Sequence, residues 1–390
     1  MKTIGIFVSV YPPPFVGGAE QSAKDYCEFL NSCGFRVRVY SLTERYEKPQ
    51  EIKGTSSIII KKYPIKLPWH PLLIASKKSK MGRLFWHVAN LYQSKNNYEI
   101  KKILLEDKID LVLCHNLPGW GTLPWRAASD LEIPLIQMCH DYGLICFKSS
   151  LWTRKLTTCT GKCLSCLPRR ISTRKHLEAE SLISVSQYVS RTIAKSLWNS
   201  VESKNFKMNV IRPPVMPPDT FNFNHQAEYD LGFLGRITQE KGIEELLEAA
   251  FRLNCTLLVA GNGEKNYISM LTQKYPCATF IGTMEKWEFL SKIKVLVAPS
   301  LWAEPLARTI IEAAIIGKPT VSSNRGGMPE IFASNNSRII GVDPQDKEKL
   351  DIALIEALEL PQGKRIDTSD KGLDLSGSQL VNEINEILNS

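Results

Sequence analysis

The stretch VLVAPSLWAEPLARTIIEAAIIGKPTVSSN (residues 295–324) places a helical pattern between two short apolar runs. The runs at 295–300 and 319–324 have the length of buried strands. The segment between them, 305–317, has the apolar spacing of a helix and ends at a glycine, as many helices do. A strand, a helix and a strand in this order predict parallel strands joined by a crossover helix.

The same alternation of strands and helices runs through both halves of the chain. At 390 residues the chain is long for one hydrophobic core, so two domains are expected. A segment with four prolines and little periodicity, 211–226, separates the two sets of strands and helices. The sequence therefore predicts an α/β fold of two Rossmann-like, doubly wound parallel-sheet domains with a cleft between them.

The composition is that of a soluble globular protein, with 43% hydrophobic and 23% charged residues. No apolar run reaches the roughly 18 to 20 residues that a transmembrane helix needs. The apolar run near the N-terminus, 4–10, is short and is followed by three prolines, which favours a first strand over a signal peptide. We expect a cytoplasmic protein.

The net charge of +9 is concentrated in one segment. Residues 61–102 contain ten Lys or Arg and one acid, Glu99, with aromatic residues interleaved. We expect this segment to interrupt the alternating pattern as an insertion. Its composition is typical of a surface that binds the phosphates of anionic lipid or nucleic acid, and a solvated helical face is the alternative. A peripheral position on the inner face of the cell membrane is compatible with it.

Open α/β sheets bind ligands beyond the carboxyl ends of their strands, close to helix N-termini. In the second half, the loop FLGRITQEKG (233–242) follows a strand and contains two cations, Arg236 and Lys241. Two cations before a helix suit a diphosphate, while an ordinary charged surface loop is the alternative.

The segment EPLARTIIE (304–312) carries a carboxylate at each end. Pro305 is predicted in the first helical turn with Glu304 at the N-cap, so that the amides at 306–308 would face an anion. Glu312 would then lie about two turns farther along and about 80° around the helix. Two such carboxylates can accept hydrogen bonds from the hydroxyl groups of one elongated ligand. A helix cap and an ordinary helix acid are the alternatives.

Two strand ends in the first half also carry candidate residues. Gly17 and Gly18 lie between the first strand and a predicted helix, and His140 and Asp141 follow the apolar run 134–139. A Gly-Gly pair is often a plain turn, and a lone histidine is often structural. Their position at strand ends makes them candidates for ligand contact.

These segments together resemble the retaining glycosyltransferases of family 4, also described as glycosyl transferases of group 1, which have the GT-B fold. The likeness is densest at 230–332. There GFLGRITQEKGIEELLEAA, LLVAGNG, FIGTM and APSLWAEPLARTIIEAAIIGKPTVSSNRGGMPEIF occur in the family's order and spacing. The resemblance implies that a sugar moves from a nucleoside diphosphate to an acceptor hydroxyl with its anomeric configuration retained.

The resemblance also implies roles for residues of the second half. Glu304 would contact the donor sugar and Glu312 the ribose, while Arg236 and Lys241 would hold the diphosphate. Backbone amides would assist at two further positions, Leu306 and Ala307. Ala307 stands where the family usually has glycine, and we expect the change to be tolerated because an amide donor needs no side chain.

In the first half, the resemblance implies that His140 contacts the donor sugar near the reacting carbon. Gly18, with Gly17 beside it, would close over the phosphates. Together with Glu304, His140 is therefore the residue expected at the reaction centre.

The resemblance further implies a domain plan and a chemistry. Residues 1–213 would bind the acceptor, 214–370 the nucleotide sugar, and the helix in 371–390 would pack back on the first domain and couple closure to donor binding. Catalysis would need no metal cofactor, because cations of the protein would neutralise the charge on the departing diphosphate. The retained configuration would imply a front-face displacement in which the departing phosphate helps to deprotonate the acceptor. A UDP-sugar is favoured as the donor, with a GDP-sugar next. The acceptor would be a saccharide, such as a lipid-linked glycan in polysaccharide biosynthesis.

Four clustered cysteines stand apart from this plan. Cys146, Cys159, Cys163 and Cys166 have short final gaps that suit a structural, tetrahedral zinc site. The last three also have the C-x3-C-x2-C spacing of iron–sulfur enzymes of the radical-SAM type. A cluster of that kind, disulfides and free thiols are the alternatives to zinc.

Two other classes of protein remain as alternatives. A membrane-surface or nucleic-acid-binding protein could be built around 61–102, although the sequence contains no helix-turn-helix or zinc-finger pattern that would favour nucleic acid. A relative with the same fold could instead act as a phosphorylase or an epimerase on sugar nucleotides.

Overall fold

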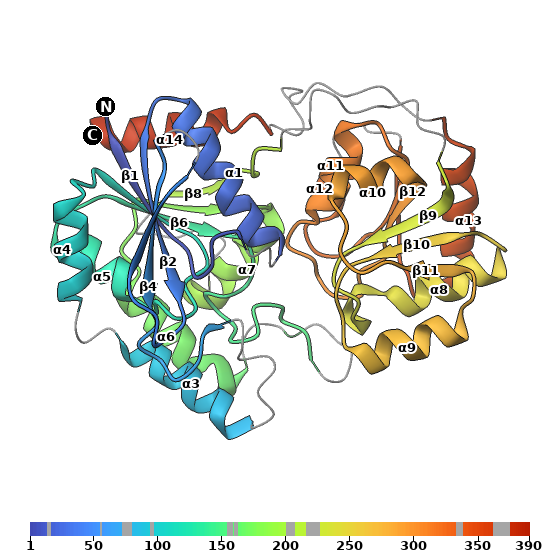
Figure 1. Cartoon of the computed structure of the whole chain (residues 1–390), viewed down its shortest axis with the longest axis horizontal. Coiled ribbons are helices and arrows are strands. Elements are labelled where there is room, and N and C mark those ends of the chain that lie inside the picture. The colour runs from blue at the N-terminus through green and yellow to red at the C-terminus, as the bar shows by residue number, and fades with distance from the viewer. Residues whose placement is uncertain are drawn as a thin grey trace. The chain divides into compact units, whose positions relative to one another are not determined.

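The computed structural model divides the chain into two compact units (Figure 1). Unit 1 comprises Met1–Ser149, Thr160–Pro214 and Ser376–Ser390, and unit 2 comprises Ser150–Cys159 and Val215–Leu375. The residues that the structure describes are 1–13, 17–54, 57–71, 80–93, 97–153, 159, 163–199, 207–215, 227–332, 338–361 and 375–390. Most of the predicted linker, 216–226, lies outside them.

Unit 1 contains an eight-stranded sheet with the strand order β3-β4-β2-β1-β5-β6-β7-β8. Neighbouring strands are parallel except for β3 and β4. The strand order reverses between β1 and β5, because β2 follows on one side of β1 and β5 pairs on the other. The strands are β1 (Thr3–Phe7), β2 (Arg36–Thr43), β3 (Gln50–Lys53), β4 (Ile59–Pro64), β5 (Leu111–Cys114), β6 (Leu135–Cys139), β7 (Ser181–Ser184) and β8 (Lys207–Val210).

The helices of unit 1 cover both faces of this sheet (Figure 1). They are α1 (Gly18–Ser32), α3 (Lys80–Tyr92), α4 (Tyr98–Glu106), α5 (Leu123–Asp130), the short η2 (Leu164–Cys166), α6 (Leu167–His176), α7 (Gln187–Trp198) and α14 (Ser378–Asn389). The last helix, α14, buries Leu380 and Ile384, which lie one turn apart, in the same core as Tyr26 of α1. Lys207 of β8 adds ion pairs to α14, and the chain's final helix is therefore part of unit 1.

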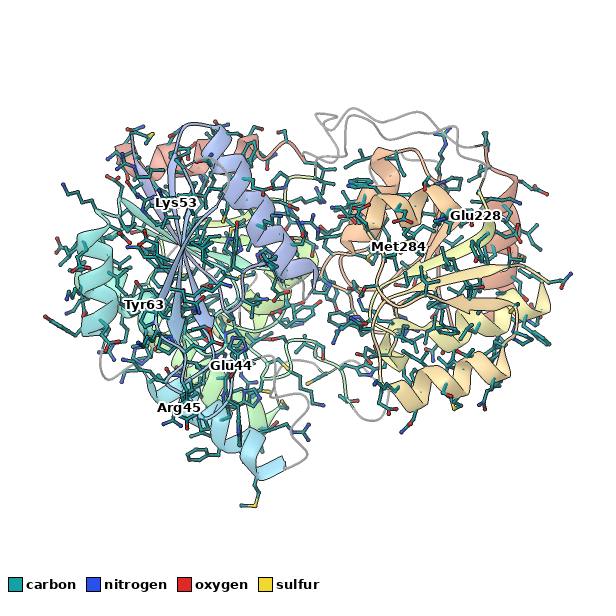
Figure 2. The ribbon with its side chains drawn as sticks, in the orientation of Figure 1. Glu44, Arg45, Lys53, Tyr63, Glu228 and Met284 are labelled. Atoms are coloured by element: carbon teal, nitrogen blue, oxygen red, sulfur yellow. The ribbon has the colours of Figure 1, made fainter. Side chains whose placement is uncertain are left out.

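The basic segment 61–102 begins inside the sheet, so its prediction as an insertion was wrong for its first residues. β4 pairs in parallel with β2, and Tyr63, labelled in Figure 2, packs edge-to-face on Trp120 with ring centroids 6.3 Å apart. Lys61 Nζ donates to Asp107 at 2.7 Å. The strand was missed because the adjacent lysines at 61 and 62 interrupt its apolar pattern. Lys61 can nevertheless lie on the strand, since Asp107 neutralises its charge.

Unit 2 contains a six-stranded parallel sheet with the order β11-β10-β9-β12-β13-β14. The strands are β9 (Tyr229–Leu234), β10 (Leu257–Ala260), β11 (Ala278–Phe280), β12 (Ile293–Ala298), β13 (Thr320–Ser323) and β14 (Ile339–Val342). The helices are η3 (Gln239–Lys241), α8 (Ile243–Arg252), α9 (Lys265–Lys274), α10 (Lys286–Lys292), α11 (Arg308–Ile315), α12 (Pro329–Phe332) and α13 (Lys347–Glu359).

Two hydrophobic cores lie on the two faces of the second sheet. α8, α9 and α13 pack on one face, and α10, α11 and α12 pack on the other (Figure 1). α8 shows why its sequence folds this way, since Ile243, Leu246, Leu247 and Ala250 follow helical spacing and are all buried. The strand order of this sheet reverses between β9 and β12, which is where ligands of such sheets bind.

Both units are thus doubly wound α/β layers around a mainly parallel sheet, and this prediction from the sequence is confirmed. One grouping differs from the domain plan. Ser150–Cys159 is assigned to unit 2, whereas the cysteine region was predicted to lie wholly in the first domain. Within the described part of the chain, no helix is long and apolar enough to cross a membrane.

Candidate active site

The loops after β9 and β12 meet at the switch point of the second sheet. Gly242, which follows η3, has a φ of +71°, and a Cβ there would lie 1.9 Å from the carbonyl oxygen of Pro299. Leu301 N–H donates to Glu240 O at 2.9 Å across the same two loops. A glycine is required for this close approach, because a side chain would both collide and strain the backbone. The approach brings Lys241 beside Glu304.

Lys241 and Glu304 form a charged pair at this point. Lys241 Nζ lies 2.7 Å from Glu304 Oε1 and 2.9 Å from Oε2, and Ser300 Oγ donates to Oε2 at 2.7 Å. Glu304 is buried, and Lys241 also lies 5.4 Å from the ring centroid of Trp302. The sequence assigned these two residues to different parts of a donor, and the structure brings them into contact. Arg236 is exposed at the start of the same loop.

The start of helix α11 corrects the sequence interpretation. The helix begins at Arg308 with Ala307 as its N-cap, so Glu304 is not the cap and Pro305 is not in the first turn. Glu304, which precedes the helix, is instead held by the turn at 326–327, because Gly327 N–H donates to Glu304 O at 2.8 Å. This contact depends on Gly326, whose φ is +68° and where a Cβ would lie 2.2 Å from the same oxygen.

Two consequences follow for the segment 304–312. Leu306 lies before the helix and Ala307 caps it, so their expected amide contacts to phosphate stay predictions. Glu312 lies in the second turn of α11, and the predicted angle of about 80° from Glu304 does not apply, because Glu304 is outside the helix.

Glu312 is held by two cations that the sequence analysis missed. Lys286 Nζ lies 2.8 Å and an Arg308 terminal nitrogen 3.4 Å from Glu312 Oε1. Glu312 is buried, with 3% of its surface exposed. Arg308 could have been found from its position four residues before an acid on a predicted helix. Lys286 could not have been found in this way, because its contact with Glu312 depends on the packing of α10 beside α11.

In unit 1, two histidines lie together after two neighbouring strands of the first sheet. His115 follows β5 and His140 follows β6, and His115 Nδ1 lies 2.7 Å from His140 Nε2. The rings stack with centroids 4.9 Å apart and planes 11° from parallel. Burial, and then the neighbouring His140, lowers the pKa of His115 well below its ordinary value, so His115 is neutral. Within the described residues, His115 Nε2 is buried without a hydrogen-bond partner.

The sequence analysis singled out His140 and missed His115. A signal was present, since the two neighbouring strands end in Cys-His-Asn (114–116) and Cys-His-Asp (139–141). Parallel strands end at the same edge of a sheet, so equal motifs after adjacent strands place equal residues side by side. The contact makes His115 a positioning residue for the ring of His140.

Asp141, next to His140, lines a pocket with Asn116, Ser149 and Arg169. Burial raises the pKa of Asp141 to about 6. A hydrogen bond from Gly143 N–H at 2.6 Å lowers the pKa, but by less than burial raises it. Glu20 of α1 raises the pKa further and Arg169 lowers it. A half-buried carboxyl that titrates near neutral pH can accept or donate a hydrogen bond to a ligand hydroxyl.

The pH dependence of unfolding is expected to reveal Asp141. Because its pKa is raised from 3.8 to about 6, its contribution to folding is complete below about pH 4 and is lost as the pH rises through 6. The free energy of unfolding of Asp141→Asn, relative to the wild type, should therefore rise by about 1 to 2 kcal/mol between about pH 4 and pH 7. Denaturant titrations across this range measure the difference, and parallel curves for the two proteins would contradict it.

Gly17 and Gly18 lie where helix α1 begins. Gly17 is its N-cap, with extended backbone, and Gly18 is its first residue. Gly17 O accepts from Gln21 N–H at 3.1 Å, which fits an ordinary helix start. Their expected approach to phosphate stays a prediction.

The four clustered cysteines, all of which the structure describes, form no disulfide bonds. A hydrogen bond with Cys146, together with burial, raises the pKa of the Cys166 thiol, and Cys163 also contacts Cys166. Cys159 belongs to the segment grouped with unit 2. Among the residues that the structure describes, no group of three or more His, Cys, Asp or Glu is placed to hold a metal ion. The zinc site stays a prediction.

Two protein-family models match the chain and together cover most of both units. One, described as Glycosyltransferase Family 4, matches residues 16–202. The other, described as Glycosyl transferases group 1, matches residues 219–372. The first falls in unit 1 and the second in unit 2, apart from the segment Ser150–Cys159.

Similar proteins extend over nearly the full length of the chain. An uncharacterised 42.6 kDa protein in the cps region of Klebsiella pneumoniae is 27% identical over 383 residues, covering 93% of each chain. The sucrose-phosphate synthase of Thermosynechococcus elongatus matches with a TM-score of 0.68 at 17% identity, over 100% of this chain and 98% of that one. HepE of Anabaena, in complex with UDP and glucose, matches with a TM-score of 0.64 at 15% identity over 100% of both chains.

Proposed function

The chain belongs to the glycosyltransferases of group 1 and family 4, with the GT-B fold that the sequence predicted, and from this premise we propose its donor, acceptor and stereochemistry. The enzyme transfers a sugar from a UDP-sugar to a saccharide carried on a lipid, in the synthesis of a polysaccharide or glycan. The sugar keeps its anomeric configuration. No metal cofactor takes part in the transfer.

One observation in unit 2 carries this proposal: two buried carboxylates, each held by at least one cation, follow the carboxyl end of the parallel strand β12, Glu304 in the loop and Glu312 in α11. Glu304 is fixed by Lys241 and Ser300, and Glu312 by Lys286 and Arg308. Fixed carboxylates accept hydrogen bonds from sugar and ribose hydroxyls, and the neighbouring cations neutralise charge on a departing diphosphate. UDP is supported as the nucleotide because HepE, which has a similar fold, forms a complex with UDP and glucose.

In the proposed reaction each residue has a separate task. Glu304 orients the donor sugar, and Lys241, with the exposed Arg236, stabilises the charge that grows on the diphosphate. Glu312 binds the ribose, which fixes the position of the nucleotide. In unit 1, Asp141 and Asn116 offer hydrogen-bonding groups to the hydroxyls of the acceptor.

The proposal is tested by thermal unfolding with UDP, GDP, ADP and CMP, followed by product analysis with the UDP-sugar. UDP at about 100 times its dissociation constant should add about 2.7 kcal/mol to the free energy of unfolding, more than the other nucleotides at equal concentration. With acceptor present, the products should be UDP and a lengthened glycan. A new UDP-sugar formed without acceptor would indicate an epimerase, and a requirement for inorganic phosphate would indicate a phosphorylase. Equal stabilisation by all four nucleotides would contradict the UDP assignment.

A further inference from the structure

Helix α3 exposes a continuous apolar stripe on unit 1. Met81, Leu84, Phe85 and Val88 have the spacing of one helix face, and 83%, 57%, 63% and 37% of their respective surfaces are exposed. The opposite side of the helix faces the protein, where Trp86 is buried and its indole N–H donates to Trp69 O at 2.8 Å. Large contiguous apolar patches on a soluble protein mark a binding surface.

A second apolar stripe lies on the neighbouring element, η2 and α6. Leu164, Leu167 and Ile171 are exposed, and the last two lie one turn apart on the same helix face. α3 and α6 are close to each other, as Figure 1 shows at the outer edge of unit 1. The pKa of His87 on α3 is lowered to about 4, first by burial and second by the charge of Arg169 on α6. The effect of Arg169 on His87 agrees with the two helices being close.

The charge on these two helices has one sign. Neither α3 nor α6 contains an Asp or a Glu in its sequence, whereas α3 contains Lys80 and Arg83 and α6 contains four Lys or Arg. Arg174 and Lys175 of α6 are exposed. By contrast, four lysines of the basic segment 61–102 are neutralised in ion pairs, namely Lys61, Lys66, Lys101 and Lys102. Among the described residues, Arg174 and Lys175 of α6 therefore present positive charge beside the apolar stripes, whereas these four lysines of 61–102 are paired.

We propose that α3 and the η2–α6 element form a docking surface for an anionic lipid bilayer, with their apolar stripes in the interface and their cations at the lipid headgroups. Interfacial helices have this combination of an apolar face and Lys or Arg without acids. Nucleic acid fits less well, because the exposed side chains of the two stripes are aliphatic or thioether groups apart from Phe85, whereas bases need aromatic platforms or hydrogen-bond donors. The surface would hold unit 1, with the acceptor pocket at Asp141, at the membrane where a lipid-linked acceptor is found.

The proposal rests on the proposed function for its lipid-linked acceptor, but vesicle binding needs neither donor nor acceptor. Sedimentation of the full chain with phosphatidylcholine vesicles, with and without phosphatidylglycerol, measures it. We expect binding to the anionic vesicles that weakens with added salt, and weak binding to neutral ones. The double variant Leu84→Ser/Phe85→Ser should bind anionic vesicles at least about tenfold more weakly. A wild-type protein that binds anionic vesicles but not UDP would contradict the proposed donor site and leave the docking surface supported.

A matched control is available on the other unit. Ile352 and Ile355 of α13 are 54% and 46% exposed, so Ile352→Ser/Ile355→Ser changes the same kind of surface and should bind vesicles as the wild type does. All three proteins should unfold at similar temperatures, because the changed side chains are exposed. Equal vesicle binding by both double variants would overturn the proposal, as would no binding of the wild type. A change of oligomeric state in Leu84→Ser/Phe85→Ser without vesicle binding would assign the surface to a second copy of the chain and would also overturn it.

Discussion

Lys241→Ala is expected to lower kcat/KM for sugar transfer by about 10²- to 10³-fold, the usual cost of removing one group that stabilises developing charge. The ammonium lies at the switch point of the second sheet, 2.7 Å from Glu304, so both the leaving diphosphate and the sugar-orienting carboxylate depend on it. Steady-state kinetics with the UDP-sugar and the acceptor measure the effect.

Two further variants separate this effect from a loss of folding. Removing Lys241 leaves Glu304 buried without its cation, which is destabilising, so Lys241→Ala/Glu304→Gln should recover stability but not activity. Lys292→Ala breaks an exposed ion pair with Glu228, labelled in Figure 2, and should leave kcat/KM unchanged. A decrease of less than about threefold in Lys241→Ala would show that the diphosphate is bound elsewhere.

Glu312→Ala is expected to remove about half or more of the stabilisation that UDP gives to the wild type at about 100 times its dissociation constant. A hydrogen bond to a charged group contributes roughly 1.5 to 3 kcal/mol, so losing the ribose contacts should raise the dissociation constant of UDP by at least about tenfold, and by more if both hydroxyls bind. The free energy of unfolding without nucleotide should also fall by about 1 to 3 kcal/mol, because Lys286 and Arg308 lose their shared partner.

Thermal unfolding over a series of UDP concentrations measures both effects at once. Glu288→Ala is the matched control, since Glu288 is an exposed acid at the start of α10. Its response to UDP should equal that of the wild type. If Glu312→Ala kept the full response to UDP, Glu312 would be a structural acid that binds Lys286 and Arg308 and does not bind the ribose.

The fold could be predicted because its signals are local. The strand and helix patterns around 295–324 and 229–263 follow from apolar spacing and from glycines at helix ends, which act over a few residues. Where local signals competed, the prediction was wrong. The start of α11 was placed at Pro305 from a preference for proline in the first turn, but contact with the turn at Gly326 holds Glu304 outside the helix.

The sequence by itself determined the two parallel-sheet units, the family, the strand ends near which Arg236, Lys241, His140 and Glu304 lie, and the helix that carries Glu312. Only the tertiary structure decided which of these residues meet. Lys241 binds a carboxylate 63 positions away, Lys286 binds one 26 positions away, and His115 contacts a histidine 25 positions away. Such contacts depend on the order of strands in a sheet and on how helices pack over it. The apolar stripes of α3 and α6 likewise became a surface only because packing left them exposed, since the same spacing in a sequence also describes a buried helix face.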